Sequence, residues 1–513
     1  MRRRGVGGLL SAAVVAAGVT VVPSVVPAAS AGVAVERVAG ADRYATSIAV
    51  SRRGWPNGSS VVVLAGGRDH RDALSASGLA GLAGHAPVLL TQPDVLRDDT
   101  RAELTRLHPS RVFIVGGTAA VSAMVEDAVR GVVGAVTRRS GDDAPSTAAA
   151  VATASGFAPR ASVLLVDAGD AAAGVVAGAL AAAKGWALLL TAGGAVLAST
   201  QSALDSLSPA HVYAVGAAAA VPAGGAERVA GDDVFSTGTE VAALGVRNGV
   251  GANHAVVASQ WSDGMSAAAL AGAFNVPLLL THPTAWHGAL DGWYRFWRPA
   301  GTTIVGGEAA VDAIVEAVIA EGGGSPARRY GSSGPVVSAI QRRLVDIGFH
   351  PGNVEGRYDT QTRFALYALQ KAFGLPVTGD VGGSELDVLA RRERPPVLRP
   401  DITASHGDHV EISIARQLVQ VVRNGAVLVS VHTSTGKPST PTIIGLFRIL
   451  DHRPGFNADG MYKTMHFSGG YAIHGYDPVP LYPASHGCAR VTYSDADLLF
   501  DIVPNGMPVI VWR

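Results

Sequence analysis

Apolar residues in the first 320 positions follow two alternating patterns. Short, nearly continuous runs of Val, Leu and Ile, such as 61–64, alternate with longer stretches rich in Ala and Leu, such as 73–82. Continuous apolar runs of this length are typical of strands buried on both faces, and the longer stretches are typical of helices. The alternation predicts α/β units with parallel sheets.

The same region repeats itself. The segment 37–46 recurs over 138–147, where Gly141, Asp143 and Thr147 are retained, and again over 228–237. Two later features recur at similar offsets. An apolar run ends at Thr91, Thr191 and Thr281, and a run that ends in glycine covers 112–117, 212–216 and 303–307. These offsets predict three tandem units over 36–133, 134–225 and 226–321.

The units resemble the type 2 cell-wall-binding repeat, which combines R-x-x-G-x-D-R-Y-x-T, D-A-L, P-x-L-L-T and a G-G strand end. The resemblance implies a triplet that holds a protein on an anionic wall polymer. Ala144 and Pro145, and later Val234 and Phe235, replace the Arg-Tyr pair of the first unit, so it stays open whether every unit binds. A purely structural scaffold is the alternative. Neither a G-x-G-x-x-G nor a Walker pattern follows the glycines, which argues against dinucleotide binding.

A glycine-rich linker is expected over 322–326, followed by apolar residues at helical spacing over 336–344 and 362–373. This small helical bundle, over 330–390, resembles the peptidoglycan-binding domain. The matching residues are Gln341, Leu344, Gly348, Gly356, Tyr358, Asp359, Thr362, Leu369 and Gln370. The alternative is a spacer bundle in which Gln341, Tyr358 and Gln370 are solvated surface residues.

After a second linker over 391–400, the pattern changes to alternating strands. They are expected over 410–414, 418–422, 426–431, 445–450 and 509–512. Asn424 and Gly425 predict a two-residue type I′ hairpin, because both residues tolerate positive φ. The sequence therefore predicts an all-β domain over 408–513.

The candidate catalytic residues lie in two short motifs of this domain, I-H-G at 473–475 and S-H-G-C-x-R at 485–490. Cys488 is the only cysteine, so no intrachain disulfide can form. A cysteine reacts as thiolate, which a neighbouring imidazole and guanidinium favour, so Cys488 is a candidate nucleophile. The alternatives are an inert buried thiol and a zinc site with His474 and His486, which would need further ligands. No cofactor or metal is expected.

These motifs resemble the L,D-transpeptidase catalytic domain of the YkuD type. The segments 434–437 and 441–447 resemble further family stretches, although Ile443 and Ile444 replace the usual turn glycine. The resemblance implies Cys488 as nucleophile, His474 as base and the Gly475 carbonyl as the group that orients its ring. In the second motif, which begins at Ser485, it implies that His486, Gly487 and the Cys488 N–H shape the oxyanion site and that Arg490 supports the loop. Papain-like peptidases use a different motif.

Charge and the N-terminus indicate the compartment. The 41 basic and 41 acidic residues cancel, which gives no sign of nucleic-acid binding. Arg2 to Arg4 precede an apolar stretch that ends in Ala29-Ser30-Ala31, which predicts a cleaved signal peptide over 1–31. The alternative is an uncleaved anchor. The mature protein is expected to be secreted, associated with the cell wall and free of the membrane.

The expected function is a wall-anchored L,D-transpeptidase of peptidoglycan biosynthesis, with stem peptides and a wall polymer as partners. Its nucleophile would attack a tetrapeptide stem, expel D-Ala and pass the acyl group to an amine. An L,D-carboxypeptidase, with water as acceptor, is one alternative. A wall-binding protein with a decayed enzyme domain is another, which the intact motif argues against.

Overall fold

The computed structural model describes residues 32–154, 162–220 and 225–513. The signal peptide expected over 1–31 lies outside these residues. Of the helices in the described part of the chain, none has both the length and the apolarity to cross a membrane.

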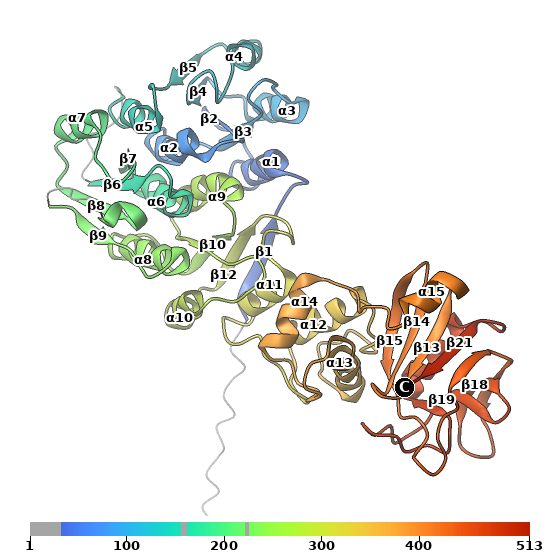
Figure 1. Cartoon of the computed structure of the whole chain (residues 1–513). Helices are drawn as coiled ribbons and strands as arrows, with labels where there is room; N and C mark the ends of the chain where they lie inside the picture. The colour runs from blue at the N-terminus through green and yellow to red at the C-terminus, as the bar shows by residue number, and fades with distance from the viewer. Residues whose placement is uncertain (1–31, 155–161, 221–224) are drawn as a thin grey trace, which may run out of the picture. The chain divides into compact units, whose positions relative to one another are not determined.

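Three four-stranded parallel sheets form the region up to residue 320, as the sequence predicts (Figure 1). The first has the order β3-β2-β4-β5, made by Val88–Thr91, Val61–Gly66, Arg111–Val115 and Val136–Arg139. The second has the order β7-β6-β8-β9, made by Ala187–Thr191, Ser162–Asp167, His211–Val215 and Glu227–Val229. The third has the order β1-β12-β10-β11, made by Ala34–Val38, Gly301–Val305, His254–Ala258 and Leu278–Leu280.

Sheets and sequence units are offset by one strand. β5 and β9 stand at the start of the second and third sequence units, yet each pairs with the sheet of the preceding unit. β1, which precedes the first helix of the first unit, pairs in parallel with β12 of the third unit, from Ala34↔Gly301 to Val38↔Val305. Each unit therefore completes its neighbour's sheet.

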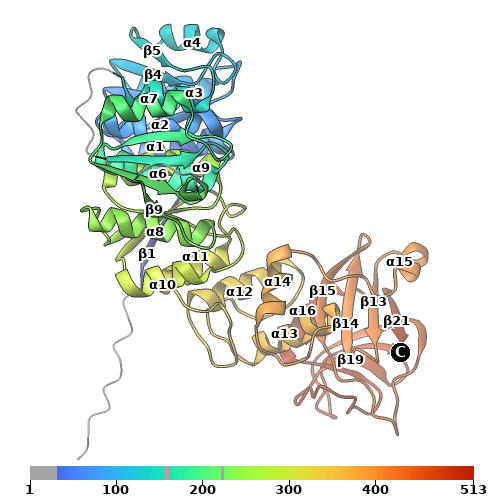
Figure 2. The ribbon, with the colours of Figure 1, turned by 60° about the vertical axis from the view of Figure 1, so that its left-hand side comes forward.

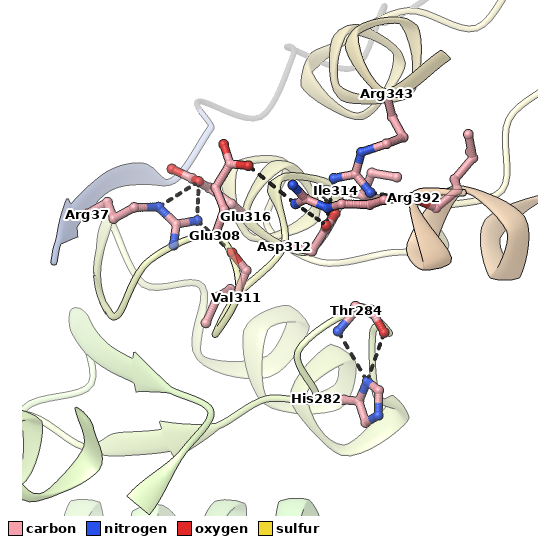
Figure 3. Close-up of polar contacts among 11 residues, drawn as sticks. Arg37, His282, Thr284, Glu308, Val311, Asp312, Ile314, Glu316, Arg343 and Arg392 are labelled. Atoms are coloured by element: carbon pink, nitrogen blue, oxygen red, sulfur yellow. Dashed lines mark hydrogen bonds and ion pairs between the residues drawn. The ribbon is translucent and has the colours of Figure 1, made fainter. Parts of the chain in front are cut away.

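The arginine at the start of the repeat motif stabilises this strand pairing between units. Arg37 donates to the carbonyl oxygens of Gly306 and Val311, at 2.8 and 2.9 Å, and pairs with Glu316 (Figure 3). Arg138 makes the corresponding contacts one unit later, with Gly116, Val121 and Glu126. The motif arginine thus acts between units.

The other repeated motif residues cap and support the N-termini of helices. Asp42, Asp143 and Asp233 are the N-caps of α1 (Arg43–Gly54), α5 (Ala144–Ala152) and α8 (Val234–Arg247). The hydroxyls of Thr46, Thr147 and Thr237 accept hydrogen bonds from the amides of Gly40, Gly141 and Gly231. An N-cap carboxylate satisfies a helix amide that would otherwise lack a partner. These residues are needed for folding whether or not a unit binds a ligand.

Helices α2 (His70–Leu82), α6 (Ala171–Lys184) and α9 (Trp261–Phe274), one from each unit, pack against one another (Figures 1 and 2). A Cβ atom added to Gly81 would lie 2.5 Å from the Ala182 Cα, and one added to Gly272 would lie 2.4 Å from the Ala182 Cβ. Only small residues allow this approach. The remaining helices are α3 (Asp98–Leu107), α4 (Ala123–Arg130), α7 (Ala198–Leu207), a 3-10 turn (Gly216–Ala220), α10 (Gly288–Trp297) and α11 (Ala313–Ala320).

A helical module follows, with α12 (Pro335–Asp346), α13 (Thr360–Phe373) and α14 (Gly383–Arg391). The alternative that Gln341, Tyr358 and Gln370 are solvated surface residues is wrong, because all three are at most 1% exposed. Gln341 donates to the Thr362 hydroxyl at 2.9 Å, and the Tyr358 hydroxyl donates to the Gly379 carbonyl at 2.6 Å. Buried polar groups with such partners fix turns, so these residues hold the module together.

The helical module packs directly on the third repeat unit. Ile314 and Val318 of α11 share one apolar cluster with Val336 and Ile340 of α12. Beside it, the Asp312 carboxylate accepts from Arg343 at 2.7 Å, and both side chains are only 3% exposed. Arg392 reaches the same carboxylate at 3.0 Å from a more open position (Figure 3). The glycine-rich segment 322–326 therefore joins two elements that pack on each other.

Two sheets enclose the core of the C-terminal β-rich domain, which the sequence also predicts (Figure 2). One has the order β15-β14-β13-β21-β16, made by Ala426–His432, Leu418–Arg423, His409–Ser413, Pro508–Trp512 and Gly445–Arg448. The other has the order β17-β18-β19-β20, made by Asp451–Phe456, Tyr462–Ser468, Tyr471–Gly475 and Ala489–Val491. Helix α15 (Pro400–His406) precedes them, and α16 (Tyr493–Ile502) packs on β18 and β19.

The predicted hairpin is confirmed. Asn424 and Gly425 have φ of 50° and 77°, and they join β14 to β15 where Arg423 pairs with Ala426.

The buried ion pair at the junction gives a stability test. Asp312→Ala should lower the free energy of unfolding by about 3–5 kcal/mol, because it leaves the Arg343 guanidinium buried without a carboxylate. Arg392→Ala removes a partly exposed partner of the same carboxylate and should cost only about 0–1 kcal/mol. Urea unfolding followed by tryptophan fluorescence compares the two. Equal losses would contradict the assignment of the buried pair as the stabilising one.

Candidate active site

Two neighbouring parallel strands bring the sequence motifs together. β19 carries His474 and β20 begins directly after Cys488, with Ile473 paired to Ala489 and His474 paired to Arg490. The connection between them, residues 476–488, leaves β19 and returns to start β20. The candidate base therefore lies on β19, and the candidate nucleophile directly precedes the adjacent strand β20.

The turn that carries Cys488 is built around a buried hydroxyl. Ser485, 1% exposed, donates to the Cys488 carbonyl at 2.5 Å and accepts from the Gly487 amide at 3.0 Å. Gly487 has φ of +122°, and a Cβ atom there would lie 2.7 Å from the Tyr471 ring. Backbone conformation and space both require glycine at this position.

The segment 434–442, which lies between β15 and β16, supports this turn. The Thr442 hydroxyl donates to the Gly487 carbonyl and accepts from the Gly436 amide, both at 2.8 Å. Ser434 and Arg490 exchange backbone hydrogen bonds at 2.9 and 3.0 Å. At the departure over 443–444, Ile444 is 54% exposed, and the glycine that follows, Gly445, has a φ of +149°.

His474 is 2% exposed, and its ring has a fixed orientation. The Nδ1 atom lies 3.0 Å from the Gly475 carbonyl, which requires a proton on Nδ1 and leaves a lone pair on Nε2. Burial lowers the pKa of His474 to about 4, although the Gly475 carbonyl opposes this shift. The ring is therefore neutral at neutral pH and can accept a proton at Nε2.

Cys488 rests as a neutral thiol. Burial raises its pKa, and this effect outweighs the Ala472 amide and Arg490, which act in the opposite direction. Its Sγ atom donates to the Gly470 carbonyl at 3.4 Å. Within the described residues, no hydrogen bond joins Sγ to His474, so the resting site holds no thiolate–imidazolium pair.

Arg490 and His486 contact different residues. The Arg490 guanidinium lies 4.2 Å from the centre of the Tyr476 ring, a cation–π contact that links the turn to the residue after Gly475. His486 is exposed, and its Nε2 atom lies 3.3 Å from the Lys437 Nζ. A protonated lysine makes this Nε2 an acceptor. No group of three or more His, Cys, Asp or Glu among the described residues is arranged to hold a metal ion.

Tyr471 and Tyr476 shape the site, and the sequence reasoning missed both. Tyr471 limits the space beside Gly487, and Tyr476 stacks on Arg490. Single aromatic residues carry no spacing signal, so only the fold assigns them these contacts.

Family models match the chain in the order of its domains. The cell wall binding domain 2 (CWB2) model matches 37–126 and 228–316, the peptidoglycan binding domain model matches 333–389, and the L,D-transpeptidase catalytic domain (YkuD) model matches 407–511. The matches thus cover two cell-wall-binding segments, one peptidoglycan-binding domain and one domain of the L,D-transpeptidase catalytic type. Residues 407–511 belong to the YkuD family of L,D-transpeptidase catalytic domains.

Individual relatives resemble parts of the chain. The N-acetylmuramoyl-L-alanine amidase LytC of Bacillus subtilis is 36% identical over 139 residues, 27% of this chain and 28% of that protein, so the chain spans less than a third of this relative. The L,D-transpeptidase of Xylanimonas cellulosilytica is 33% identical, covering 36% of this chain and 96% of that one, with a TM-score of 0.33. Cwp6 of Clostridium difficile, 19% identical, covers 75% of this chain and 65% of that one with a TM-score of 0.51, and shares the fold.

The neutral resting thiol predicts an alkaline alkylation profile. Because burial disfavours the thiolate, the iodoacetamide rate should still rise between pH 8.5 and 10, above the ordinary cysteine pKa of about 8.5. As Cys488 is the only cysteine, mass spectrometry of the whole protein measures this rate directly. Glutathione, measured in parallel, calibrates the reagent. A plateau below pH 7 would contradict the neutral thiol.

Proposed function

We propose that this protein is a secreted, wall-anchored L,D-transpeptidase that cross-links peptidoglycan through a thioester on Cys488. The carrying observation is the pairing of β19 with β20, which sets a neutral, oriented His474 beside the turn of Cys488. The YkuD family match supports the reaction class.

The first half-reaction forms the thioester. The Cys488 thiol turns from the Gly470 carbonyl toward His474, whose Nε2 takes the proton as sulphur attacks the carbonyl carbon of the L,D peptide bond. The tetrahedral intermediate collapses, the C–N bond breaks, and the protonated His474 returns the proton to the leaving D-Ala amine. The acyl group remains on sulphur.

The second half-reaction reverses the proton path. An acceptor amine attacks the thioester carbonyl carbon, and His474 takes a proton from the amine. When the C–S bond breaks, the protonated His474 returns that proton to sulphur, which restores the Cys488 thiol and the neutral ring. The product is a direct cross-link. Water at the same thioester would give a tripeptide, the product of an L,D-carboxypeptidase.

The backbone of the turn is suited to the oxyanion. The Gly487 amide already bonds to the Ser485 hydroxyl, so we assign the Cys488 N–H as the main donor to the developing negative charge. His486 lies at the solvent side of the same turn and, with Lys437, gives a polar edge to the site. Arg490 supports the turn through Ser434 and Tyr476.

The units over 36–133, 134–225 and 226–321 and the module over 330–390 would hold the enzyme on the wall. Several weak sites on one chain raise avidity through effective concentration. The repeated Arg, Gly, Asp and Thr residues serve folding, so polymer contacts are expected at positions that differ between units. Export through the segment 1–31 would bring the protein to its substrate.

Acylation of Cys488 tests the enzymatic proposal. Intact-mass spectrometry should detect a transient adduct with tetrapeptide stems and, by resemblance to L,D-transpeptidases, a stable adduct with a carbapenem. His474→Ala should slow adduct formation by about 10²–10⁴-fold, because general-base help of that size is lost. His486→Ala should slow it less. Cross-linked dimers identify an amine acceptor, and tripeptides alone identify water.

Cys488→Ala is the matched control and should give no adduct while remaining folded. If neither the stem peptide nor the carbapenem acylates the folded wild-type protein, the enzymatic proposal is wrong. The protein would then be a wall-binding protein without this activity. An unchanged rate in His474→Ala would remove His474 from the mechanism.

Wall binding can be measured with the full chain. Sedimentation with purified walls should retain the protein, and the bound fraction should fall after hydrofluoric acid strips anionic polymer from the peptidoglycan. Raising the salt concentration should weaken binding to untreated walls, because exposed charges are screened. Equal binding to both wall preparations would assign anchoring to the peptidoglycan and not to an anionic polymer.

A further inference from the structure

A buried lysine of the helical module reaches into the catalytic domain. Lys371 on α13 is only 9% exposed, and its Nζ donates to the Gln417 carbonyl at 3.0 Å and to Nδ1 of His432 on β15. Burial lowers the pKa of Lys371 to about 7. An amine in such a place costs free energy unless its hydrogen bonds are made, so both contacts have structural consequences.

The first arm runs through His432 to the loop between the two catalytic motifs. His432 is fully buried, and its ring stacks on Phe364 of α13 with 5.4 Å between centres. Burial, aided by Lys371, lowers its pKa to about 3, so the ring is neutral. It accepts from Lys371 at Nδ1 and donates from Nε2 to the Val479 carbonyl at 3.2 Å. Val479 belongs to the loop that connects His474 to Cys488.

The second arm runs through Gln417 to the nucleophile turn. The Gln417 side chain accepts from the Thr435 amide at 2.8 Å and donates to its hydroxyl at 2.6 Å. The Thr435 carbonyl accepts from the amides of Ala484 and Ser485, at 2.9 and 3.0 Å. Ser485 then holds Gly487 and Cys488 through its hydroxyl.

We infer that Lys371 of the helical module is a positioning residue for the nucleophile turn of the catalytic domain. Both arms begin at the amino group of Lys371. One ends at Val479 and the other at Ser485, and both residues lie in the connection 476–488 between His474 and Cys488. The module is thus part of the catalytic machinery, in addition to any role in holding the wall. The consequence for rate rests on the proposed acylation of Cys488.

The experiment compares two variants of the full chain. Lys371→Met removes the amino group from which both arms begin. Arg416→Ala is the matched control, because Arg416 donates to the carbonyls of Lys371 and Ala372 at the same interface, both at 3.2 Å, but is part of neither arm. Carbapenem acylation is resolved into a binding constant and a maximal acylation rate, with thermal unfolding measured beside it.

Lys371→Met should lower the maximal acylation rate on the order of tenfold, since small displacements of reacting groups have large effects, and should change carbapenem binding less than twofold. Arg416→Ala should change neither. A loss of similar size in both variants, or a change confined to binding, would assign Lys371 to domain docking and overturn the inference.

Hydrogen exchange separates this inference from the proposed function. Amides in residues 476–488 should exchange faster in Lys371→Met than in the wild type or Arg416→Ala, a result that needs no turnover. Unchanged exchange in that loop would overturn the positioning role. If the wild type is not acylated at all, the proposed function fails, while the exchange comparison still decides whether Lys371 orders the turn.

Discussion

The hydroxyl group of Ser485 fixes the turn on which Cys488 stands. It accepts from the Gly487 amide and donates to the Cys488 carbonyl, so it sets the backbone on both sides of the thiol. Because Ser485 is buried, water cannot replace these bonds without opening the turn. Thr442 and Ser434, from the segment between β15 and β16, support the same turn. The direction of the thiol therefore depends on contacts that never touch a substrate.

Much of the fold could be predicted because hydrophobic periodicity reports burial directly. It indicated the parallel sheets and the helical module. The hairpin was indicated separately, by the tolerance of Asn424 and Gly425 for positive φ. The exchange of β1 onto β12 could not be predicted, since a strand has the same apolar pattern whichever parallel sheet receives it. Gln341 and Gln370 were open to misassignment because amide side chains are mostly exposed. Their burial depends on turns that supply their partners in three dimensions.

The candidate site could likewise be predicted from the sequence only in part. Motif resemblance named Cys488, His474 and the Gly475 carbonyl, and the structure places the His474 ring 3.0 Å from that carbonyl. The roles of Tyr471 and Lys371 had no signal in the sequence. Tyr471 limits the space beside Gly487, and Lys371 reaches the catalytic domain from the helical module. Such contacts arise from packing between segments far apart in the chain, which local patterns do not record.

The neutral state of the resting site fits the compartment proposed for the enzyme. Thiolates are the form that oxidants attack, and a secreted protein with one cysteine has no partner to protect it. Burial raises the pKa of Cys488 and lowers that of His474, so both groups resist charging until substrate arrives. In the proposed mechanism, proton transfer from Cys488 to His474 therefore accompanies the attack of sulphur. A fixed turn becomes essential, because a neutral thiol gains reactivity only when the His474 ring lies in reach.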